Sequence, residues 1–301
     1  MEPPRVNLRV AGRDSKFYIL DWDNNILHMP TRIHLEKRQP DGTWLPHPVS
    51  TSVFSAERKD VDMVSYRPLD GDWKKAFAEF QDPADASENR FLGDTATAID
   101  RVLANPGAAA PSFKAFRRTL VEGRLFAIVT ARGHSAETLK KGVRLFIDRV
   151  LSPGERAEMM ASLRGYRACF DGVEAFGDDP AELDHYLDLN HYHAVTSPAF
   201  EALVAAAHNG APLGQEERKL LAIRTFIEHI IRILEEKSAL GKPVSVGFSD
   251  DDPGNVNAVV NYIDELKRLF PSVKFVVYDT SSPTLEGGRK ITVSGQMDLG
   301  L

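Results

Sequence analysis

The chain has little that would support a disulfide framework, a membrane span or a nucleic-acid interface. Its one cysteine, Cys169, excludes an internal disulfide and any metal or iron–sulfur site built from several cysteines. No apolar run approaches the length of a membrane-spanning helix, and the amino-terminal residues contain no apolar stretch of signal-peptide length. Lys and Arg number 37 against 43 Asp and Glu, whereas a nucleic-acid-binding protein usually carries a surplus of positive charge. We therefore expect a cytoplasmic protein with no membrane and no nucleic-acid partner.

The composition is that of an ordinary globular protein. The 301 residues are 43% hydrophobic and 27% charged, which allows a sizeable core in one elaborated domain or two smaller ones. Positive charge is concentrated in residues 111–150, which contain nine basic side chains and three acidic ones. Such a region either attracts an anionic substrate or consists of helices whose Lys and Arg side chains are solvated.

Four short apolar runs predict the strands of a parallel sheet. Each is a continuous run rather than an alternation, which is typical of strands covered on both faces. Helical periodicity is present in residues 112–122, 215–237 and 253–270, with Asp252 as the expected cap of the last helix. The fold class is therefore α/β, a Rossmann-like parallel sheet flanked by helices. The four runs are Phe17–Leu20, Leu125–Val129, Val244–Phe248 and Val273–Tyr278.

Two segments interrupt this pattern. Residues 32–110 contain a predicted hairpin around Gln39–Thr43, followed by loops and short helices over Asp82–Pro111. Residues 134–212 are expected to form a mostly helical insert. The remaining residues, 1–31, 111–133 and 213–301, are assigned to the α/β core.

Polar side chains follow the first three of these runs, where functional residues of an open parallel sheet lie. Asp21 and Asp23 follow the first run, Thr130 the second and Asp250–Asp252 the third, and Lys219 lies early in a long helix between them. Mg²⁺ prefers oxygen ligands, including carboxylates. One carboxylate can attack phosphorus while another transfers protons, and a hydroxyl and an ammonium group can stabilise charge on the phosphoryl oxygens. These groups are the parts needed to process a phosphate ester with Mg²⁺.

The order of these groups resembles the four motifs of the haloacid dehalogenase (HAD) superfamily, most of whose members are Mg²⁺-dependent phosphatases. The first motif corresponds to Ile19-Leu-Asp-Trp-Asp23, the second to Ile128-Val-Thr130, the third to Lys219 and the fourth to Gly247–Asn255. The motif-bearing segments cover about half of the chain. Residues 32–110 and 134–212 occupy the places where that family carries a hairpin flap and cap elements.

This resemblance implies a role for each matching residue. Asp21 would be the nucleophile and a metal ligand. Asp23 would be the general acid and base, with its backbone carbonyl as a second metal ligand, and Thr130 would bind phosphoryl oxygens. Asp251 is the preferred further metal ligand because Asp251 and Asn255 reproduce the acidic–amide spacing of the last motif, and Asp250 is the alternative. Mg²⁺ is the implied cofactor.

Other assignments rest on weaker patterns. Lys237, Lys242 and Arg224 are alternatives to Lys219 as the cation of the third motif. Arg132, just beyond Thr130, and Asn255 are candidate substrate-binding residues. Asn25 departs from the Thr or Val that the family usually has at this position, and Ser-Asp-Asp-Asp replaces its common Gly-Asp.

Three histidines could suggest a second metal site. His191 and His193 would share one face of a strand, and His185 lies nearby in the sequence. Because no third ligand occurs at a defined spacing, ordinary packing is the preferred interpretation.

The expected function is hydrolysis of a phosphorylated small molecule through an aspartyl-phosphate intermediate. Two alternatives stay open: a phosphotransferase or phosphomutase that uses the same groups, and a catalytically weak HAD-like module that binds a phosphorylated ligand or a protein. The sequence does not identify the substrate or the oligomeric state.

Overall fold

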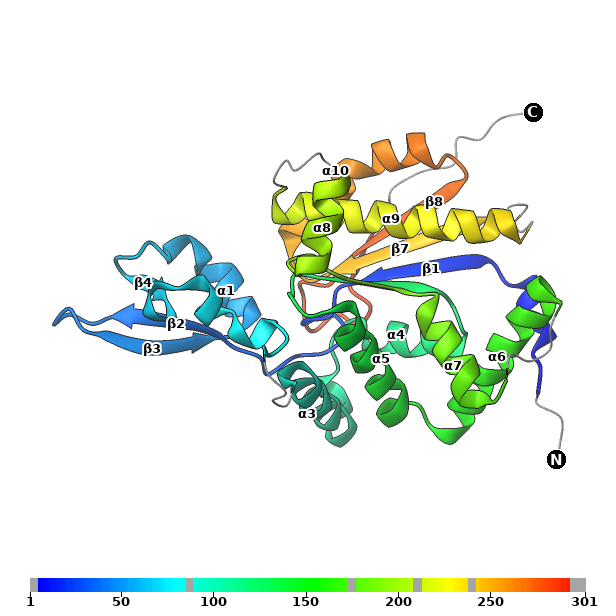
Figure 1. Ribbon diagram of the computed structural model, residues 1–301, viewed down its shortest axis with the longest axis horizontal. Helices are drawn as coiled ribbons and strands as arrows, with labels where there is room; N and C mark the ends of the chain where they lie inside the picture. Colours follow the sequence, from blue (N-terminus) through cyan, green and yellow to red (C-terminus); the bar gives the residue numbers. More distant parts are fainter. Residues whose placement is uncertain (1–4, 85–88, 173–176, 208–212, 238–241, 293–301) are drawn as a thin grey trace.

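The structure is a computed structural model that describes residues 5–84, 89–172, 177–207, 213–237 and 242–292. Within these residues a six-stranded sheet has the order β6–β5–β1–β7–β8–β9, and Figure 1 labels its central strands β1, β7 and β8. Neighbouring strands are parallel, except that β9 is antiparallel to β8. The predicted α/β architecture, a mainly parallel sheet flanked by helices, is confirmed and is consistent with a Rossmann-like fold. The strands are β1 (Ser15–Leu20), β5 (Phe126–Thr130), β6 (His191–Ala194), β7 (Val244–Asp250), β8 (Val273–Asp279) and β9 (Arg289–Thr292).

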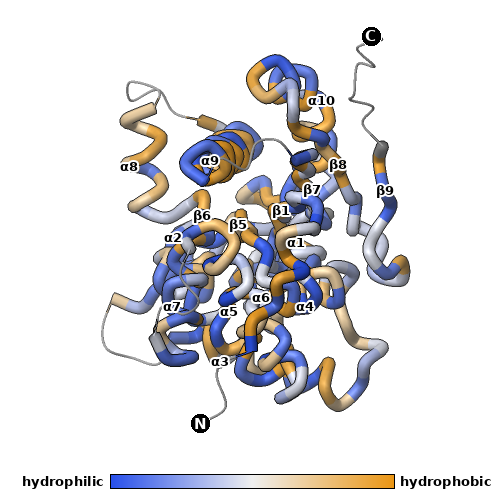
Figure 2. The backbone as a smooth tube through the Cα atoms, turned by 90° about the vertical axis from the view of Figure 1, so that its right-hand side faces the viewer, coloured by the Kyte–Doolittle hydropathy of each residue, from blue (hydrophilic) through white to orange (hydrophobic). Residues whose placement is uncertain are grey.

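Helices cover both faces of this sheet, as Figure 2 shows in a view along the strands. One face packs against α3 (Arg90–Ala104), α4 (Phe113–Val121), α5 (Ala136–Val150), α6 (Pro153–Asp171) and α7 (Asp179–Asp188). The other face packs against α8 (Pro198–Ala207), α9 (Gln215–Glu236) and α10 (Pro253–Leu269). Asp252 caps α10 as predicted, since its side chain accepts the backbone N–H of Gly254 at 2.7 Å.

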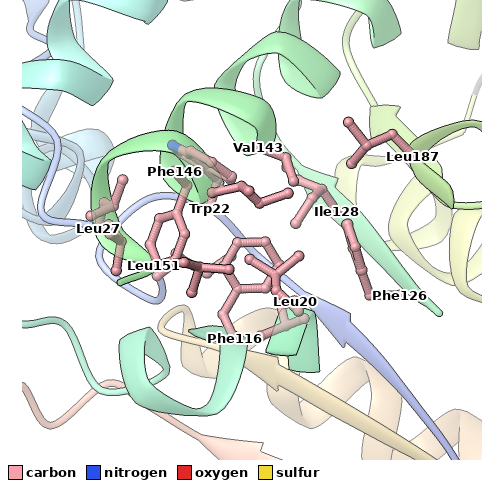
Figure 3. Close-up of a cluster of buried hydrophobic side chains, with 14 of the residues drawn as sticks. Leu20, Trp22, Leu27, Phe116, Phe126, Ile128, Val143, Phe146, Leu151 and Leu187 are labelled. Carbon is pink, nitrogen blue, oxygen red and sulfur yellow. The ribbon is translucent and has the colours of Figure 1, made fainter. Parts of the chain in front are cut away.

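Aromatic rings fill the larger hydrophobic cluster (Figure 3). Trp22, directly after the first predicted catalytic aspartate, is fully buried, and its ring centroid lies 5.5 Å from that of Phe91 and 6.3 Å from that of Phe116. Phe116 in turn contacts Phe126 and Phe146. Burying large apolar side chains is the dominant favourable term in folding. Packing of this cluster against one face of the sheet therefore fixes the position of the end of β1.

The predicted hairpin is confirmed and belongs to a small module over residues 33–80. Its sheet has the order β3–β2–β4, with β2 antiparallel to both neighbours. Figure 1 shows this module beyond the carboxyl ends of the main strands. It contains β2 (Ile33–Arg38), β3 (Trp44–Val49), α1 (Thr51–Glu57), β4 (Tyr66–Pro68) and α2 (Trp73–Ala76), and the 3₁₀-helix Ala78–Phe80 leads out of it.

Two expectations from the sequence differ from the structure. Asp82–Pro111, expected as loops and short helices, contains the 15-residue helix α3. Its buried residues, Phe91, Thr95, Ala98, Ile99 and Val102, recur at helical spacing and form one stripe. Residues 134–212, expected as an insert, contribute β6 to the main sheet and α5 to its core within the described ranges.

The basic region does not present unpaired positive charge. Each of its nine Lys and Arg side chains forms an ion pair with a carboxylate, and most of these pairs lie at the surface. This favours the interpretation as solvated helices over an anion-attracting face. The pairs are Lys114–Glu286, Arg117–Glu155, Arg118–Glu122, Arg124–Glu122, Arg132–Asp23, Lys140–Asp188, Lys141–Glu137, Arg144–Asp184 and Arg149–Asp100.

None of the helices in the described ranges combines the length and the apolar composition that crossing a membrane requires.

Candidate active site

The pairing register of β1 brings the predicted acidic residues together. Leu20 lies opposite Ser249 of β7 on one side and opposite Ile128 of β5 on the other. The next residue, Asp21, therefore lies beside Asp250, and its backbone N–H donates to the carbonyl of Ser249 at 3.1 Å. Thr130 ends β5 at the same edge and is buried. Parallel pairing alone thus gathers residues from three distant parts of the sequence.

Lys219 of α9 joins two of the carboxylates. Its Nζ lies 2.7 Å from Oδ2 of Asp250 and 3.3 Å from Oδ1 of Asp21. All three side chains are buried. Carboxylate oxygens of Asp21, Asp250 and Asp251 lie within 4.8 Å of one another, and we call these three residues the acidic cluster.

One ammonium group does not balance three carboxylates in this buried place. Burial raises the pKa of Asp21 and of Asp251, and the charges of the neighbouring carboxylates raise both further. Burial alone would lower the pKa of Lys219, but the charges of Asp21 and Asp250 outweigh it, so that this pKa is raised and the ammonium form persists. The cluster therefore carries uncompensated negative charge when it is ionised.

This charge and these donors fit a divalent metal ion. Carboxylate oxygens are the ligands that Mg²⁺, Mn²⁺ and Ca²⁺ prefer, and a cation would relieve the repulsion inside the cluster. The donors alone do not select one of these metals.

Asp250 and Asp251 have different surroundings. The Asp250 carboxylate accepts from Lys219, from the backbone N–H of Asp252 at 2.9 Å and from Nδ2 of Asn255 at 3.1 Å. In the described part of the chain no donor is found on the carboxylate of Asp251, which is also the more exposed of the two. This leaves the oxygens of Asp251 freer for a metal, in keeping with the preference for it derived from the sequence.

Asp23 is held by Arg132 rather than by the acidic cluster. Nε and Nη2 of Arg132 each lie 2.7 Å from one oxygen of Asp23, and Nη2 also donates to Oγ1 of Thr31 at 2.8 Å. The guanidinium carbon lies 4.7 Å from the ring centroid of Phe80 and 5.1 Å from that of Phe91. A bidentate pair between two aromatic rings fixes the orientation of the Asp23 carboxylate.

The two candidate substrate-binding residues are therefore engaged with acidic residues. Arg132 is 1% exposed and binds Asp23, and Asn255 is buried and binds Asp250. In this structure both side chains hold the carboxylate of an acidic residue in place by hydrogen bonds.

Asn25 ties the first motif to two other strands, a role that the sequence did not reveal. Its fully buried Nδ2 donates to the carbonyl of Asp21 at 3.0 Å and to the carbonyl and hydroxyl oxygens of Ser249 at 3.1 and 3.0 Å. Its Oδ1 accepts the hydroxyl of Thr280, beyond β8, at 2.9 Å. The departure from the usual Thr or Val was visible, but Ser249 and Thr280 lie more than two hundred residues away in the sequence.

The alternatives to Lys219 lie elsewhere. Lys237 pairs with Asp171, Lys242 donates to the carbonyl of Ala11, and Arg224 pairs with Glu228.

The histidines do not form a metal site among the described residues. His191 and His193 share one face of β6 as predicted, with Nδ1 and Nε2 3.1 Å apart, and His229 stacks on His191. Both ring nitrogens of His229 lie within hydrogen-bond distance of other partners, Leu189 and Arg232. Burial and the neighbouring histidines lower the pKa of His191 to about 3 and that of His193 to about 4, so both are neutral. They pack as uncharged rings.

Comparisons of the chain with family models, with curated proteins and with solved structures find no match.

The acidic cluster predicts the effect of removing one charge. In the absence of metal, Asp251→Asn should raise the free energy of unfolding by on the order of 1 kcal/mol at pH 8, because it removes like-charge repulsion. A raised carboxyl pKa destabilises the fold where the group is ionised, so the gain should fade as the pH falls toward about 4, the ordinary carboxyl pKa. Urea denaturation in EDTA at pH 5, 6.5 and 8 measures it.

Added Mg²⁺ should make the wild type more stable than Asp251→Asn, the reverse of the order without metal. A ligand at one hundred times its Kd stabilises a protein by about 2.7 kcal/mol, and Asp251→Asn should lose most of this increment. Asp60→Asn, an exposed carboxylate in the module, is the matched control and should behave as the wild type. Equal Mg²⁺ stabilisation in all three proteins would contradict Asp251 as a ligand.

Proposed function

We propose that the chain is a Mg²⁺-dependent phosphatase of the HAD type, acting on a phosphorylated small molecule through an aspartyl-phosphate on Asp21. The single observation that carries this proposal is the bridge of Lys219 between Asp21 and Asp250. Residues 198 positions apart meet in a buried cluster at the carboxyl edge of the sheet, with Asp251 beside them. Buried charges at such an edge are costly to the fold, so a functional use is the economical explanation.

In the first step an oxygen of Asp21 attacks phosphorus while the bond to the leaving-group oxygen breaks. The leaving oxygen keeps the electron pair of the broken bond and takes a proton from Asp23. For Asp23 to carry that proton, one of the two hydrogen bonds that Arg132 donates to its carboxylate must break. Lys219 keeps the attacking carboxylate oriented through both steps.

In the second step Asp23 accepts a proton from water, whose oxygen attacks the same phosphorus. The bond between phosphorus and Asp21 then breaks, and phosphate and free Asp21 are restored. A bound Mg²⁺, held by Asp21 and Asp251, would neutralise charge on the phosphoryl oxygens. Thr130 lies at the same edge and is the proposed hydroxyl donor to those oxygens.

Phosphate release from p-nitrophenyl phosphate and from a panel of sugar phosphates and nucleotides tests this function. We expect release with Mg²⁺ and none with EDTA. Transfer to an added alcohol in place of water would identify a phosphotransferase. A folded protein that binds Mg²⁺ but releases no phosphate from any member of the panel would contradict phosphatase activity toward these compounds.

Asp23→Asn should slow turnover by about 10²- to 10⁴-fold, the usual contribution of a positioned acid or base. Both formation and hydrolysis of the phosphoenzyme should slow, because the same carboxyl serves both steps. Rapid-quench kinetics with p-nitrophenyl phosphate separates them. A substrate with a good leaving group needs little acid assistance, so its first step should be affected less than that of an alkyl phosphate. A wild-type rate for alkyl phosphates would remove Asp23 from proton transfer.

A further inference from the structure

A cavity of about 170 Å³ lies at the amino edge of the main sheet, opposite the edge that carries the acidic cluster. Its walls include Ser15, the first residue of β1, Leu125, directly before β5, and residues of α6, α7 and the carboxyl end of α9. Figure 2 views the molecule from this side. A strand rises about 3.3 Å per residue, so β1 alone puts roughly 20 Å between the cavity and Asp21. The cavity is therefore separate from the candidate active site.

The floor of the cavity is apolar and partly aromatic. Phe17, Leu163 and Tyr186 line it and are buried, while Tyr166 and Phe170 stack with ring centroids 6.2 Å apart and planes 13° from parallel. Apolar cavities of about 150 Å³ admit benzene. The space is therefore sufficient for one aromatic ring.

Basic side chains line the cavity around this floor, although the chain as a whole carries a net negative charge. Three carboxylates line the cavity, and each is paired with a cation that also lines it. The pairs are Asp14–Lys16, Asp171–Lys237 and Glu182–Arg167.

Two further cations of the lining, Arg13 and Lys242, are bonded to backbone carbonyls instead. Arg13 donates to the carbonyl of Glu122 at 3.0 Å, and Lys242 donates to that of Ala11. Over the described ranges neither forms an ion pair with a carboxylate. Their charges are therefore available to an anion, and both side chains are partly exposed at the edge of the cavity.

We propose that this cavity binds a small amphipathic anion, with one aromatic ring against the apolar floor and a carboxylate directed at Arg13 and Lys242. The apolar floor favours the ring through burial, and the unpaired cations favour the acid over a neutral analogue of the same shape. The inference uses no part of the acidic cluster and does not depend on the proposed phosphatase activity.

Binding of 3-phenylpropionate to the full chain tests this proposal, with ligand-observed NMR titration as the measurement. Two matched compounds separate the contributions: 3-phenylpropanamide lacks the charge, and propionate lacks the ring. We expect saturable binding at one site, at least about tenfold tighter for the acid than for the amide, as charge-assisted hydrogen bonds imply. Propionate should not bind measurably. Equal affinity of acid and amide, or uptake that does not saturate, would overturn the proposal.

Variants locate the site. Arg13→Gln with Lys242→Gln should reduce the preference for the acid to near unity, and Leu189→Trp, which enlarges a half-buried lining residue, should abolish binding of the ring. Lys59→Gln with Lys274→Gln removes two exposed charges elsewhere and should leave affinity unchanged. Wild-type affinity in both cavity variants would place the ligand elsewhere and contradict the assignment. Circular dichroism confirms that each variant is folded.

Discussion

Asp21→Asn is expected to reduce phosphate release by about four orders of magnitude or more, the scale seen when a catalytic nucleophile is removed. An amide oxygen is a poor nucleophile toward phosphorus, and it also weakens metal binding because it carries no charge. The fold should survive, since Asn has nearly the same shape and the substitution lowers the repulsion inside the acidic cluster. Initial rates with the best substrate of the panel, at saturating Mg²⁺, give the measurement.

The chain offers a closely matched control for this variant. Asp252→Asn changes an aspartate of the neighbouring loop, but its side chain caps α10, and Asn is an equally good cap. It should keep wild-type activity and stability. Trapping of phosphate on the wild-type enzyme after acid quench, and none on Asp21→Asn, would identify the covalent intermediate. Substantial turnover by Asp21→Asn would contradict the nucleophile assignment.

Lys219→Met should destabilise the protein by about 3–5 kcal/mol at pH 8 without metal, the cost of removing one partner of a buried ion pair. Methionine fills a similar volume, so the change is mainly electrostatic. Three carboxylates then remain without their cation. Typical proteins are stable by about 5–15 kcal/mol, so a folded fraction should persist for measurement by urea denaturation.

Two conditions should rescue this variant. Lower pH protonates Asp21 and Asp251, whose pKa values are already raised, so the destabilisation should shrink between pH 8 and pH 5. Saturating Mg²⁺ should also restore part of the loss by replacing the missing positive charge. Lys237→Met, next to the end of the same helix but in a surface pair with Asp171, is the control and should cost less than about 1 kcal/mol. Similar losses in both variants, independent of pH, would contradict this account.

The residues of the acidic cluster could be predicted because parallel pairing places the carboxyl ends of neighbouring strands at the same edge of the sheet. Each of the strands β1, β5 and β7 contains a continuous apolar run, and the residues at the carboxyl ends of such runs must meet at one edge. The sequence therefore identified Asp21, Asp250, Asp251 and Thr130 as neighbours. Lys219 was identified from its place in the order of motifs and from its position in the first turn of a helix, where a lysine opposes the helix dipole.

The pairing partners inside the site could not be predicted in this way. The bonds of Arg132 to Asp23 and of Asn25 to Ser249 join side chains across loops whose paths are set by tertiary packing. The edge strand β9 was also missed, because Arg289–Thr292 is short and polar at its start.

The acidic cluster also affects the kinetics of folding. Asp250 and Asp251 are adjacent in the sequence, but Asp21 meets them only when β1 pairs with β7, across most of the chain. In the unfolded ensemble Asp21 lies much farther from these two residues than the Debye length of about 8 Å, so it hardly interacts with them. Repulsion that arises late in folding acts mainly on the unfolding rate. We therefore expect the neutralising substitution Asp21→Asn to lengthen the lifetime of the native state while leaving the refolding rate nearly unchanged.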